Sequence, residues 1–188
     1  MGLRKRLKPR LGPLYAMAGA FLFWASPTPA TLVGGGALVL LGESIRLWAT
    51  GHLHKNDSLT VTGPYAFLRH PLYVGSLLIV TGFAWMASSP VCLALYAGFL
   101  LFFAGYYMPY KNRIEGARLE SLYGDAFRRY AIAVPTVVPR LYAYSPLLAD
   151  EAPESEWRSE RFADNNEIGT AAAVVVGAAG MVVRWAFV

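Results

Sequence analysis

Long apolar segments separated by short polar turns dominate the chain. Residues 11–42 carry no charged side chain, and neither do residues 72–110. Each run is longer than the roughly 20 residues that one membrane-spanning helix needs. Turn-forming residues lie near the middle of each run, Pro27 and Pro29 in the first and Ser88-Ser89-Pro90 in the second. The pattern therefore predicts two helical hairpins, with spans near 12–26, 31–50, 72–88 and 90–108.

A fifth apolar run, Ile168 to Val183, follows an acidic and irregular stretch, residues 141–167. We interpret this stretch as a tether with a short helix around Trp157, and residues 168–188 as a C-terminal transmembrane helix. Apolar residues make up 55% of the chain, and a soluble fold of this size would have to bury every face of its helices. We therefore predict an all-α, polytopic membrane protein with about five transmembrane helices and a functional core over residues 1–140.

The basic residues predict how the chain is oriented. Lys and Arg cluster before the first span, occur between the second and third spans, and recur through residues 109–167, whereas the short turns at 27–30 and 88–90 have none. By the positive-inside rule, the N-terminus, the loop between the second and third spans, and the long segment are cytoplasmic. This asymmetry and contact with anionic membrane lipids account for the net charge of +5, so no nucleic-acid partner is expected.

The sequence gives no support for a metal-binding site or a nucleotide-binding motif. Cys92 is the single cysteine, which excludes an internal disulfide and a thiolate metal cluster. His52 and His54 have no further histidine or acidic cluster at ligand spacing, so we expect no metal site. The chain also lacks the glycine-rich patterns of Rossmann and P-loop nucleotide sites.

Glu43 and Arg46 are ionisable residues inside the second predicted span. They lie three residues apart on one helical face, so they can pair locally. An ionisable residue at membrane depth indicates function by default. A structural ion pair that locks the helices explains the two residues equally well, and both interpretations stay open.

The stretch from Gly63 to Gly75 is basic and turn-forming, yet it lies between long apolar segments. Proline is favoured at the first position of a helix, so Pro71 is expected to begin one, with Arg69 and His70 at its mouth. The unpaired N–H groups of that first turn and the Arg69 charge favour an anionic group there. A basic turn on the membrane surface, with Arg69 on lipid phosphate, is the alternative.

Residues 109–140 are predicted to contain an amphipathic helix from Arg113 onward, which Gly124 interrupts and Pro135 ends. Apolar side chains recur every three or four residues at Leu119, Tyr123, Phe127 and Tyr130. The helix could lie on the membrane surface. Alternatively it is a lid that closes a cavity against the loop between the second and third spans. In that arrangement Glu115 faces the cavity and can hold an ammonium group.

Two motifs together resemble a known family. Leu59-Thr-Val-Thr-Gly-Pro-Tyr65 followed by Arg69-His-Pro-Leu-Tyr-Val-Gly75 resembles the cofactor motif of isoprenylcysteine carboxyl methyltransferases and related membrane phospholipid methyltransferases. Downstream, Glu115, Leu119, Tyr123-Gly124, Phe127 and Tyr130 resemble the family's carboxy-terminal motif. The order and spacing agree over about residues 40–140. Two departures stand out, since Gly116 replaces the second glutamate of a Glu-Glu pair and Asp57 replaces the usual histidine.

The resemblance implies that S-adenosylmethionine binds on the cytoplasmic side, under the amphipathic segment, and that a lipid-like acceptor enters from the bilayer. Glu115 would contact the cofactor from the later helix, and Arg113 or Lys111 would orient an acceptor carboxylate. Arg69 and His70, at the N-terminal end of the helix that begins at Pro71, would hold the cofactor's own carboxylate. Catalytic candidates are thus Arg113 and Glu115, and the remaining cofactor-lining candidates are Asp57, Ser58, Leu59, Thr60, Tyr65, His70, Pro71, Leu72 and Tyr73.

The expected chemistry needs few catalytic groups. A sulfonium already carries an activated methyl group, so the protein has to align the acceptor and exclude water. A carboxyl oxygen is favoured over an amine as the acceptor, because an amine must first lose a proton. The acceptor is an isoprenylcysteine-type carboxylate or another isoprenoid or phospholipid. A sterol-reductase-like enzyme that uses NADPH, and a non-enzymatic membrane scaffold, remain alternatives, and the oligomeric state stays open.

Overall fold

The computed structural model describes residues 12–53, 58–146, 156–165 and 167–187, and every regular element in these ranges is helical. The all-α prediction is confirmed. In chain order the elements are α1 Gly12–Trp24, α2 Pro29–His52, the 3₁₀ turn η2 Gly63–Ala66, α3 Pro71–Ala87, α4 Pro90–Phe102, the π turn η3 Phe103–Tyr107, α5 Met108–Ala133, α6 Arg161–Asp164 and α7 Glu167–Ala186.

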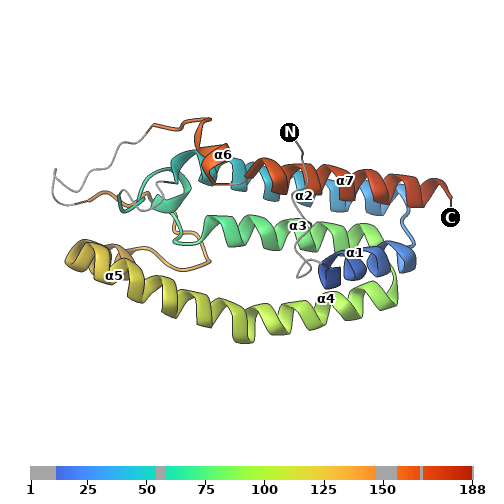
Figure 1. Cartoon of the computed structure of the whole chain (residues 1–188), viewed down its shortest axis with the longest axis horizontal. Coiled ribbons are helices and arrows are strands. Elements are labelled where there is room, and N and C mark those ends of the chain that lie inside the picture. Colours follow the sequence, from blue (N-terminus) through green and yellow to red (C-terminus); the bar gives the residue numbers. More distant parts are fainter. Residues whose placement is uncertain (1–11, 54–57, 147–155, 166, 188) are drawn as a thin grey trace, which may run out of the picture.

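Three of the described helical segments are long and apolar enough to cross a membrane: α2, the continuous α4–η3–α5 helix and α7. The apolar α3, at 17 residues, is slightly shorter. Figure 1 shows α2, α3 and α7 running along one another, with α4 returning beside them and continuing into α5. Large apolar side chains of α4, such as Leu93 and Leu101, are exposed, which is the arrangement expected of a surface that faces lipid.

Prolines and hydroxyl side chains define where the helices begin. The Thr28 hydroxyl accepts a hydrogen bond from the Thr31 N–H, and the Thr31 hydroxyl accepts one from the Thr28 N–H, which forms a capping box. Ser89 caps α4 by accepting from the Cys92 N–H. Each of these helices has proline in its first turn, and so does α3, where Pro71 directly follows His70. The predicted helix start at Pro71 is therefore confirmed.

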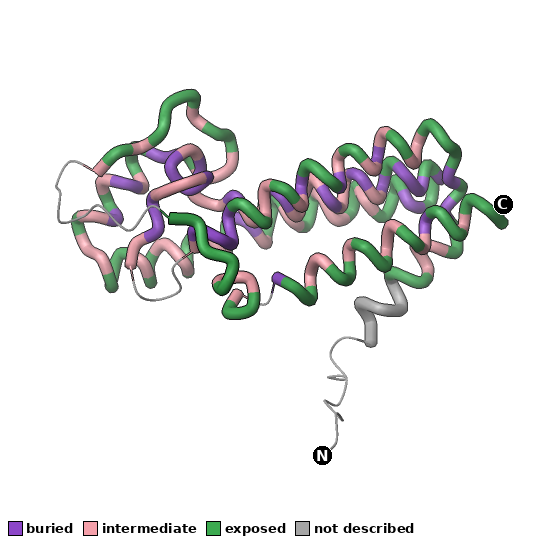
Figure 2. The backbone as a smooth tube through the Cα atoms, turned by 90° about the horizontal axis from the view of Figure 1, so that it is seen from above, coloured by how far each residue is buried: buried purple, intermediate pink, exposed green. Residues whose placement is uncertain are grey.

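The closest packing in the fold is between α2 and α3. A Cβ atom on Gly42 would lie 2.5 Å from the Gly75 carbonyl oxygen, and one on Gly82 would lie 2.6 Å from the Gly35 oxygen. These glycines let the two backbones touch, as small residues do between membrane helices. Figure 2 shows the buried residues running along this contact and gathering again at the end of the molecule that holds the loop between α2 and α3.

The long helix from α4 to α5 changes character at η3. The π turn, Phe103–Tyr107, ends two residues before Pro109. Proline cannot donate a backbone hydrogen bond, and its ring crowds the carbonyl four residues earlier, so a local π turn relieves both problems. Further along, Gly124 adopts φ 52° and ψ −124° and kinks α5. The predicted interruption at Gly124 is confirmed, as is an end just before Pro135.

The amphipathic face of α5 packs against the central loop between α2 and α3, of which the structure describes residues 53 and 58–70. Phe127 and Tyr130 are buried with Val61 and Val134. The segment that follows α5 runs back along the loop and pairs with it through backbone hydrogen bonds. The N–H groups of Arg69 and His70 donate to the oxygens of Pro135 and Thr136, respectively. The N–H groups of Arg140 and Tyr144 donate to the oxygens of Phe67 and Ala66, respectively. The structure therefore has the lid arrangement rather than a helix lying free on a surface.

The structure differs from two expectations, one about an ion pair and one about a short helix. Arg46 does not pair with Glu43: it binds Glu167 of α7, with Nη2 2.7 Å from Oε2 and Nε 2.8 Å from Oε1. The short helix does not lie around Trp157 but four residues later, at α6. The Trp157 indole N–H instead donates to the Leu47 carbonyl oxygen.

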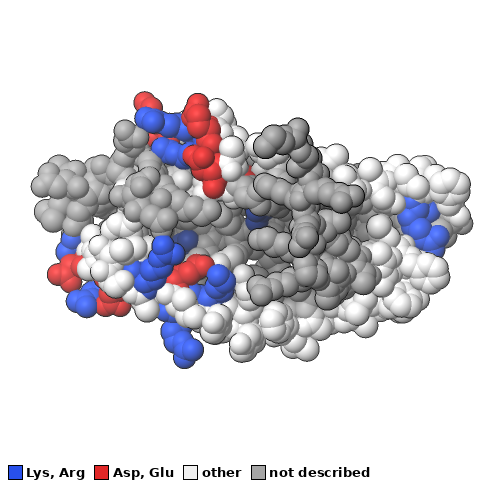
Figure 3. Space-filling view, in the orientation of Figure 1, with Lys and Arg blue, Asp and Glu red and all other residues white. Residues whose placement is uncertain are grey.

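Charged side chains gather at one end of the molecule. On the face in Figure 3 they lie over the end that holds α5 and α6, and a small basic patch lies at the opposite end. Near that opposite end, Arg184 in the last turn of α7 donates to the backbone oxygens of Ala25 and Phe23. The charge distribution agrees with a helix bundle that has one large polar end and an apolar middle.

We expect Gly82→Ala to lower the free energy of unfolding by about 1–3 kcal/mol, because the added methyl group would overlap the α2 backbone. Gly98→Ala on α4 is the matched control, since a Cβ atom there meets nothing within 4 Å. Thermal unfolding of both variants in the same detergent measures the difference. Equal midpoints for the two variants would contradict the role of the glycine contact.

Candidate functional site

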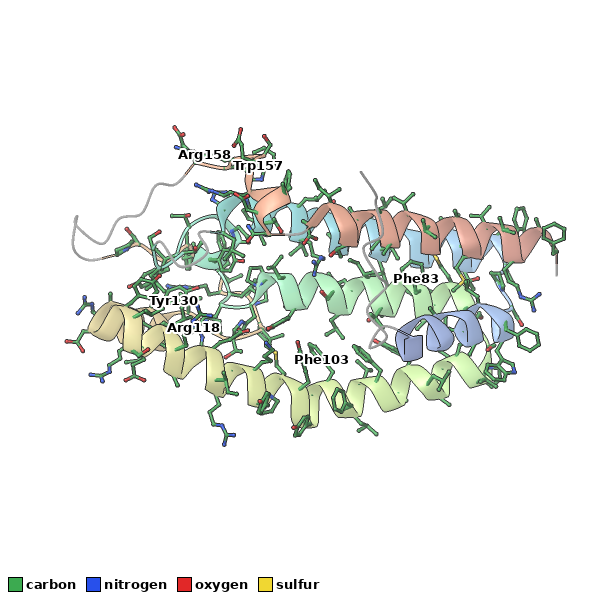
Figure 4. All side chains as sticks on the ribbon, in the orientation of Figure 1. Phe83, Phe103, Arg118, Tyr130, Trp157 and Arg158 are labelled. Carbon is green, nitrogen blue, oxygen red and sulfur yellow. The ribbon has the colours of Figure 1, made fainter. Side chains whose placement is uncertain are left out.

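A cavity of about 300 Å³ lies between the central loop, the first turn of α3 and the inner face of α5. Its size is at the lower end of the range for small-molecule pockets. Arg118 and Tyr130, labelled in Figure 4, project from α5 on this side of the helix. The lining residues are Leu53, Ser58, Leu59, Thr60, Tyr65, Arg69, His70, Pro71, Leu72, Tyr73, Asn112, Glu115, Gly116, Arg118, Leu119, Leu122, Tyr123, Phe127 and Tyr130.

Glu115 joins the two halves of the site. Its Oε1 accepts a hydrogen bond of 2.9 Å from the Tyr73 hydroxyl on α3. Its Oε2 lies 3.7 Å from His70 Nδ1, and Lys111 Nζ lies 3.5 Å from Oε1. The carboxylate therefore links the start of α3 to α5. About a third of its side chain is accessible, so the group can still meet a cation in the cavity.

His70 is neutral in this environment. Burial is the main cause that lowers its pKa below the ordinary value of 6.5, and Arg69 acts in the same direction, against the opposing effects of Asn112 and Glu115. Its Nε2 lies 3.4 Å from the Asn112 Oδ1. The tautomer with the proton on Nε2 donates to that oxygen.

Arg69 is held in place but keeps donor capacity. Its Nη2 donates to the Thr136 hydroxyl at 2.6 Å. Its Nε is buried and has no hydrogen-bond partner among the described residues. A buried unpaired donor costs free energy unless a partner arrives. Because Arg69 also lines the cavity, an anionic ligand group is a partner of suitable chemistry.

The wall of the cavity on the loop side is aromatic and apolar. Tyr65 is buried, and burial raises the pKa of its phenol group. The Tyr130 hydroxyl donates to the Tyr65 carbonyl oxygen at 2.8 Å, so the loop and α5 are tied together beside the cavity. Phe127 and Leu119 complete an apolar surface of the kind that binds a flat aromatic ring.

The structure brings most of the predicted site residues together. Asp57 lies outside the described residues. Neither Arg113 nor Lys111 lines the cavity: Arg113 is exposed, whereas Lys111 lies beside the cavity and pairs with Glu115. The predicted residues that line the cavity are Ser58, Leu59, Thr60, Tyr65, Arg69, His70, Pro71, Leu72, Tyr73 and Glu115.

Asn112 and Arg118 line the cavity but were not among the predicted site residues. Each lies three residues from Glu115, so the helical period places all three on neighbouring parts of one face. This helical spacing from Glu115 is the sequence signal from which both residues could have been predicted. Among the described residues, no cluster of histidine, cysteine or acidic side chains could hold a metal ion.

Comparisons with known proteins agree with this geometry. The phospholipid methyltransferase family model matches residues 30–126. The cobalt-zinc-cadmium resistance protein CzcN of Cupriavidus metallidurans is 39% identical over 124 residues, which is 64% of this chain and 54% of the relative. The protein-S-isoprenylcysteine O-methyltransferase of Schizosaccharomyces pombe is 31% identical over 105 residues, 55% of this chain and 42% of that enzyme.

A third relative, the nickel-cobalt-cadmium resistance protein NccN of Alcaligenes xylosoxydans xylosoxydans, is 36% identical over 98 residues, 51% of this chain and 44% of the relative. The chain thus spans about half the length of the curated relatives it matches. No solved structure matches it. The matched segment, residues 30–126, includes α2, α3 and the part of α5 that carries Glu115, so it covers both halves of the cavity.

The lowered pKa of His70 predicts a pH dependence of stability. The unfolded chain takes up a proton on His70 near pH 6.5, whereas the folded protein resists it to lower pH. The contribution of neutral His70 to the free energy of unfolding is therefore complete above pH 6.5, and it is lost as the pH falls toward the lowered pKa. Between about pH 7.5 and 5.5, the unfolding midpoint of the wild type should fall more than that of His70→Gln. Parallel profiles would contradict the assignment of a neutral His70.

Proposed function

Because this chain belongs to the phospholipid methyltransferase family, we propose that it is an integral membrane methyltransferase that transfers a methyl group from S-adenosylmethionine to a lipid-like acceptor. The observation that carries the proposal is the Tyr73–Glu115–His70 cluster, which joins the two family-like motifs at a cavity. These motifs lie more than forty residues apart in the sequence, and α3 and α5 bring them within hydrogen-bond distance.

The residues of the cavity fit this cofactor. Arg69 offers a buried, unpaired Nε to the carboxylate of the methionine part. Glu115 offers a partly accessible carboxylate to the ammonium or sulfonium charge. The apolar and aromatic side chains around Tyr65 and Phe127 suit the adenine ring. The donor set therefore matches a ligand with one anionic group, two cationic groups and a flat ring.

The proposed mechanism relies on positioning. The bound cofactor supplies an activated methyl group. Glu115, oriented by the Tyr73 hydroxyl, holds the positive end of the ligand at the start of α3. The lid formed by α5 and residues 134–144 covers the central loop and keeps water away from the reacting atoms. Neutral His70 keeps Asn112 in place and can accept a proton at Nδ1. Orientation and water exclusion of this kind can supply much of the rate enhancement of a methyl transfer.

A lipid-like acceptor is supported by the side of the cavity that meets the apolar bundle. Tyr73 lies edge-on to Tyr107, and Phe99, Phe103 and Tyr107 stack in a row along the long helix. Figure 4 shows Phe103 between this helix and α3. The row connects the site with the membrane-facing region. A carboxyl oxygen remains the favoured methyl acceptor, with Lys111 rather than Arg113 placed near the cavity to orient it.

The proposed orientation places the site on the cytoplasmic side. On the face in Figure 3, most of the described Lys and Arg side chains lie at the end of the bundle that holds the cavity, and further Lys and Arg precede the first span in the sequence. Positive charge is enriched on the cytoplasmic side of membrane proteins, so the N-terminus and the cavity belong there.

Calorimetric titration of the detergent-purified protein tests the proposal. We expect S-adenosylmethionine to bind and NADPH not to bind. Glu115→Gln should weaken S-adenosylmethionine binding by about tenfold or more, because the ligand's positive charge loses its carboxylate partner. Glu120→Gln is the matched control, since Glu120 lies on the same helix but pairs at the surface with Arg128.

Transfer of a labelled methyl group to lipid acceptors follows if the cofactor binds. Methylation of a prenylcysteine carboxylate supports the favoured acceptor, and methylation of a phospholipid amine points to the other branch of the family. Binding of NADPH alone would replace the proposal with a reductase. If folded protein binds neither ligand, the scaffold alternative is preferred.

A further inference from the structure

A buried ionic network joins three helices next to the cavity. The Arg46 network consists of Arg46, Glu167, the Ser76 hydroxyl and the Leu72 carbonyl. Arg46 on α2 binds Glu167 on α7 through two parallel hydrogen bonds of 2.7 and 2.8 Å. The third nitrogen, Nη1, donates to Ser76 Oγ at 2.5 Å and to the Leu72 oxygen at 3.3 Å. All three guanidinium nitrogens therefore have partners on α3 or α7.

The network is shielded from water. Side-chain exposure is 12% for Arg46 and 4% for Glu167. A paired charge in such a place is tolerated, whereas removing one partner leaves the other as an uncompensated buried charge. If Glu167 loses its charge, Arg46 is expected to turn toward water or another anion. Its hydrogen bonds to α3 would be lost with it.

The α3 end of the network is the first turn of the helix that forms the site. Leu72 lies between Pro71 and Tyr73, and all three line the cavity. The Ser76 hydroxyl also donates to the Leu72 oxygen, at 2.8 Å, so this carbonyl accepts from both Arg46 and Ser76. Tyr73, one residue later, is the hydrogen-bond donor to Glu115. Arg46 therefore holds the turn that orients Tyr73.

Gly75 makes this contact possible. A Cβ atom at position 75 would lie 2.6 Å from Arg46 Cγ and 2.7 Å from the Gly42 oxygen. The stem of Arg46 thus passes directly over Gly75 to reach the first turn. The glycine that closes the Arg69–Gly75 motif has a specific structural task, which is to admit the side chain of Arg46. Glu167, in contrast, lies outside residues 30–126 that match the family.

We propose that Arg46 and Glu167 are positioning residues for the cofactor cavity, through which the C-terminal helix α7 holds the first turn of α3 in its binding geometry. The inference rests on the proposed function for its ligand. Its structural part, the control of the first turn of α3 by α7, does not depend on that ligand. Attaching α7 to the rest of the bundle is a different role from positioning the turn. Arg184 attaches α7 at the other end of the helix, where it donates to the Ala25 and Phe23 carbonyl oxygens.

The first experiment compares Glu167→Gln with Arg184→Gln in the full chain, in detergent. Two quantities are measured: the hydrogen exchange of amides 72–76 without ligand, and the dissociation constant of S-adenosylmethionine. Glu167→Gln should speed exchange in the first turn of α3 and raise the dissociation constant by about tenfold. Arg184→Gln should leave both close to the wild-type values. Equal effects of the two variants, or no effect of Glu167→Gln, would overturn the proposal.

A charge exchange separates positioning from simple attachment. The double variant Arg46→Glu with Glu167→Arg keeps an ion pair between α2 and α7, but a glutamate at position 46 cannot donate to the Leu72 oxygen. We expect it to recover the thermal stability lost in Glu167→Gln without recovering ligand affinity. Recovery of both would show that attachment of α7 is sufficient and would overturn the positioning role.

Ser76→Ala keeps the test decisive if the double variant does not fold. This change removes one α3 contact and leaves the Arg46–Glu167 pair intact. It should speed exchange of amides 72–76 with little change in the unfolding midpoint, and unchanged exchange would count against the proposal. If the wild type fails to bind S-adenosylmethionine, the proposed function fails, and the exchange comparison alone decides whether α7 controls the turn.

Discussion

The contact between α2 and α3 is the constraint on which the rest of the structure depends. Pairs of glycines, Gly35 with Gly82 and Gly42 with Gly75, bring the two backbones together. In a membrane, apolar side chains gain little by leaving lipid, so close backbone packing and polar contacts hold helices together. The close approach also lets the Arg46 side chain cross α3 at Gly75 and reach the Leu72 oxygen. Packing and polar bonding thus occur at the same place.

The cavity forms where two connecting segments are tied to each other beside this helix pair. The central loop leaves α2 at His52 and enters α3 at Pro71, and residues 134–144 pair with it by backbone hydrogen bonds. The kink at Gly124 and the buried Phe127 and Tyr130 turn the end of α5 over the loop. The site therefore combines a floor, the first turn of α3, with a covering segment formed by α5 and residues 134–144.

The polar groups divide by depth into two sets. At the polar end, Glu115, His70, Arg69 and Asn112 surround the cavity with capacity left for a ligand. Deeper in the bundle, Arg46 and Glu167 satisfy each other almost completely. Glu43 is the exception, because both of its carboxyl oxygens are buried without a hydrogen-bond partner among the described residues.

The sequence by itself determined the helical membrane fold, the helix starts at proline and the kink at Gly124, because hydropathy and local backbone chemistry act over a few residues. It also indicated both motifs of the site, because their residues resemble the family's motifs in order and spacing. Only the tertiary structure decided that Arg46 pairs with Glu167, 121 residues away, rather than with Glu43. The choice depends on how α7 packs against α2 and α3, and no local pattern in α2 records that packing.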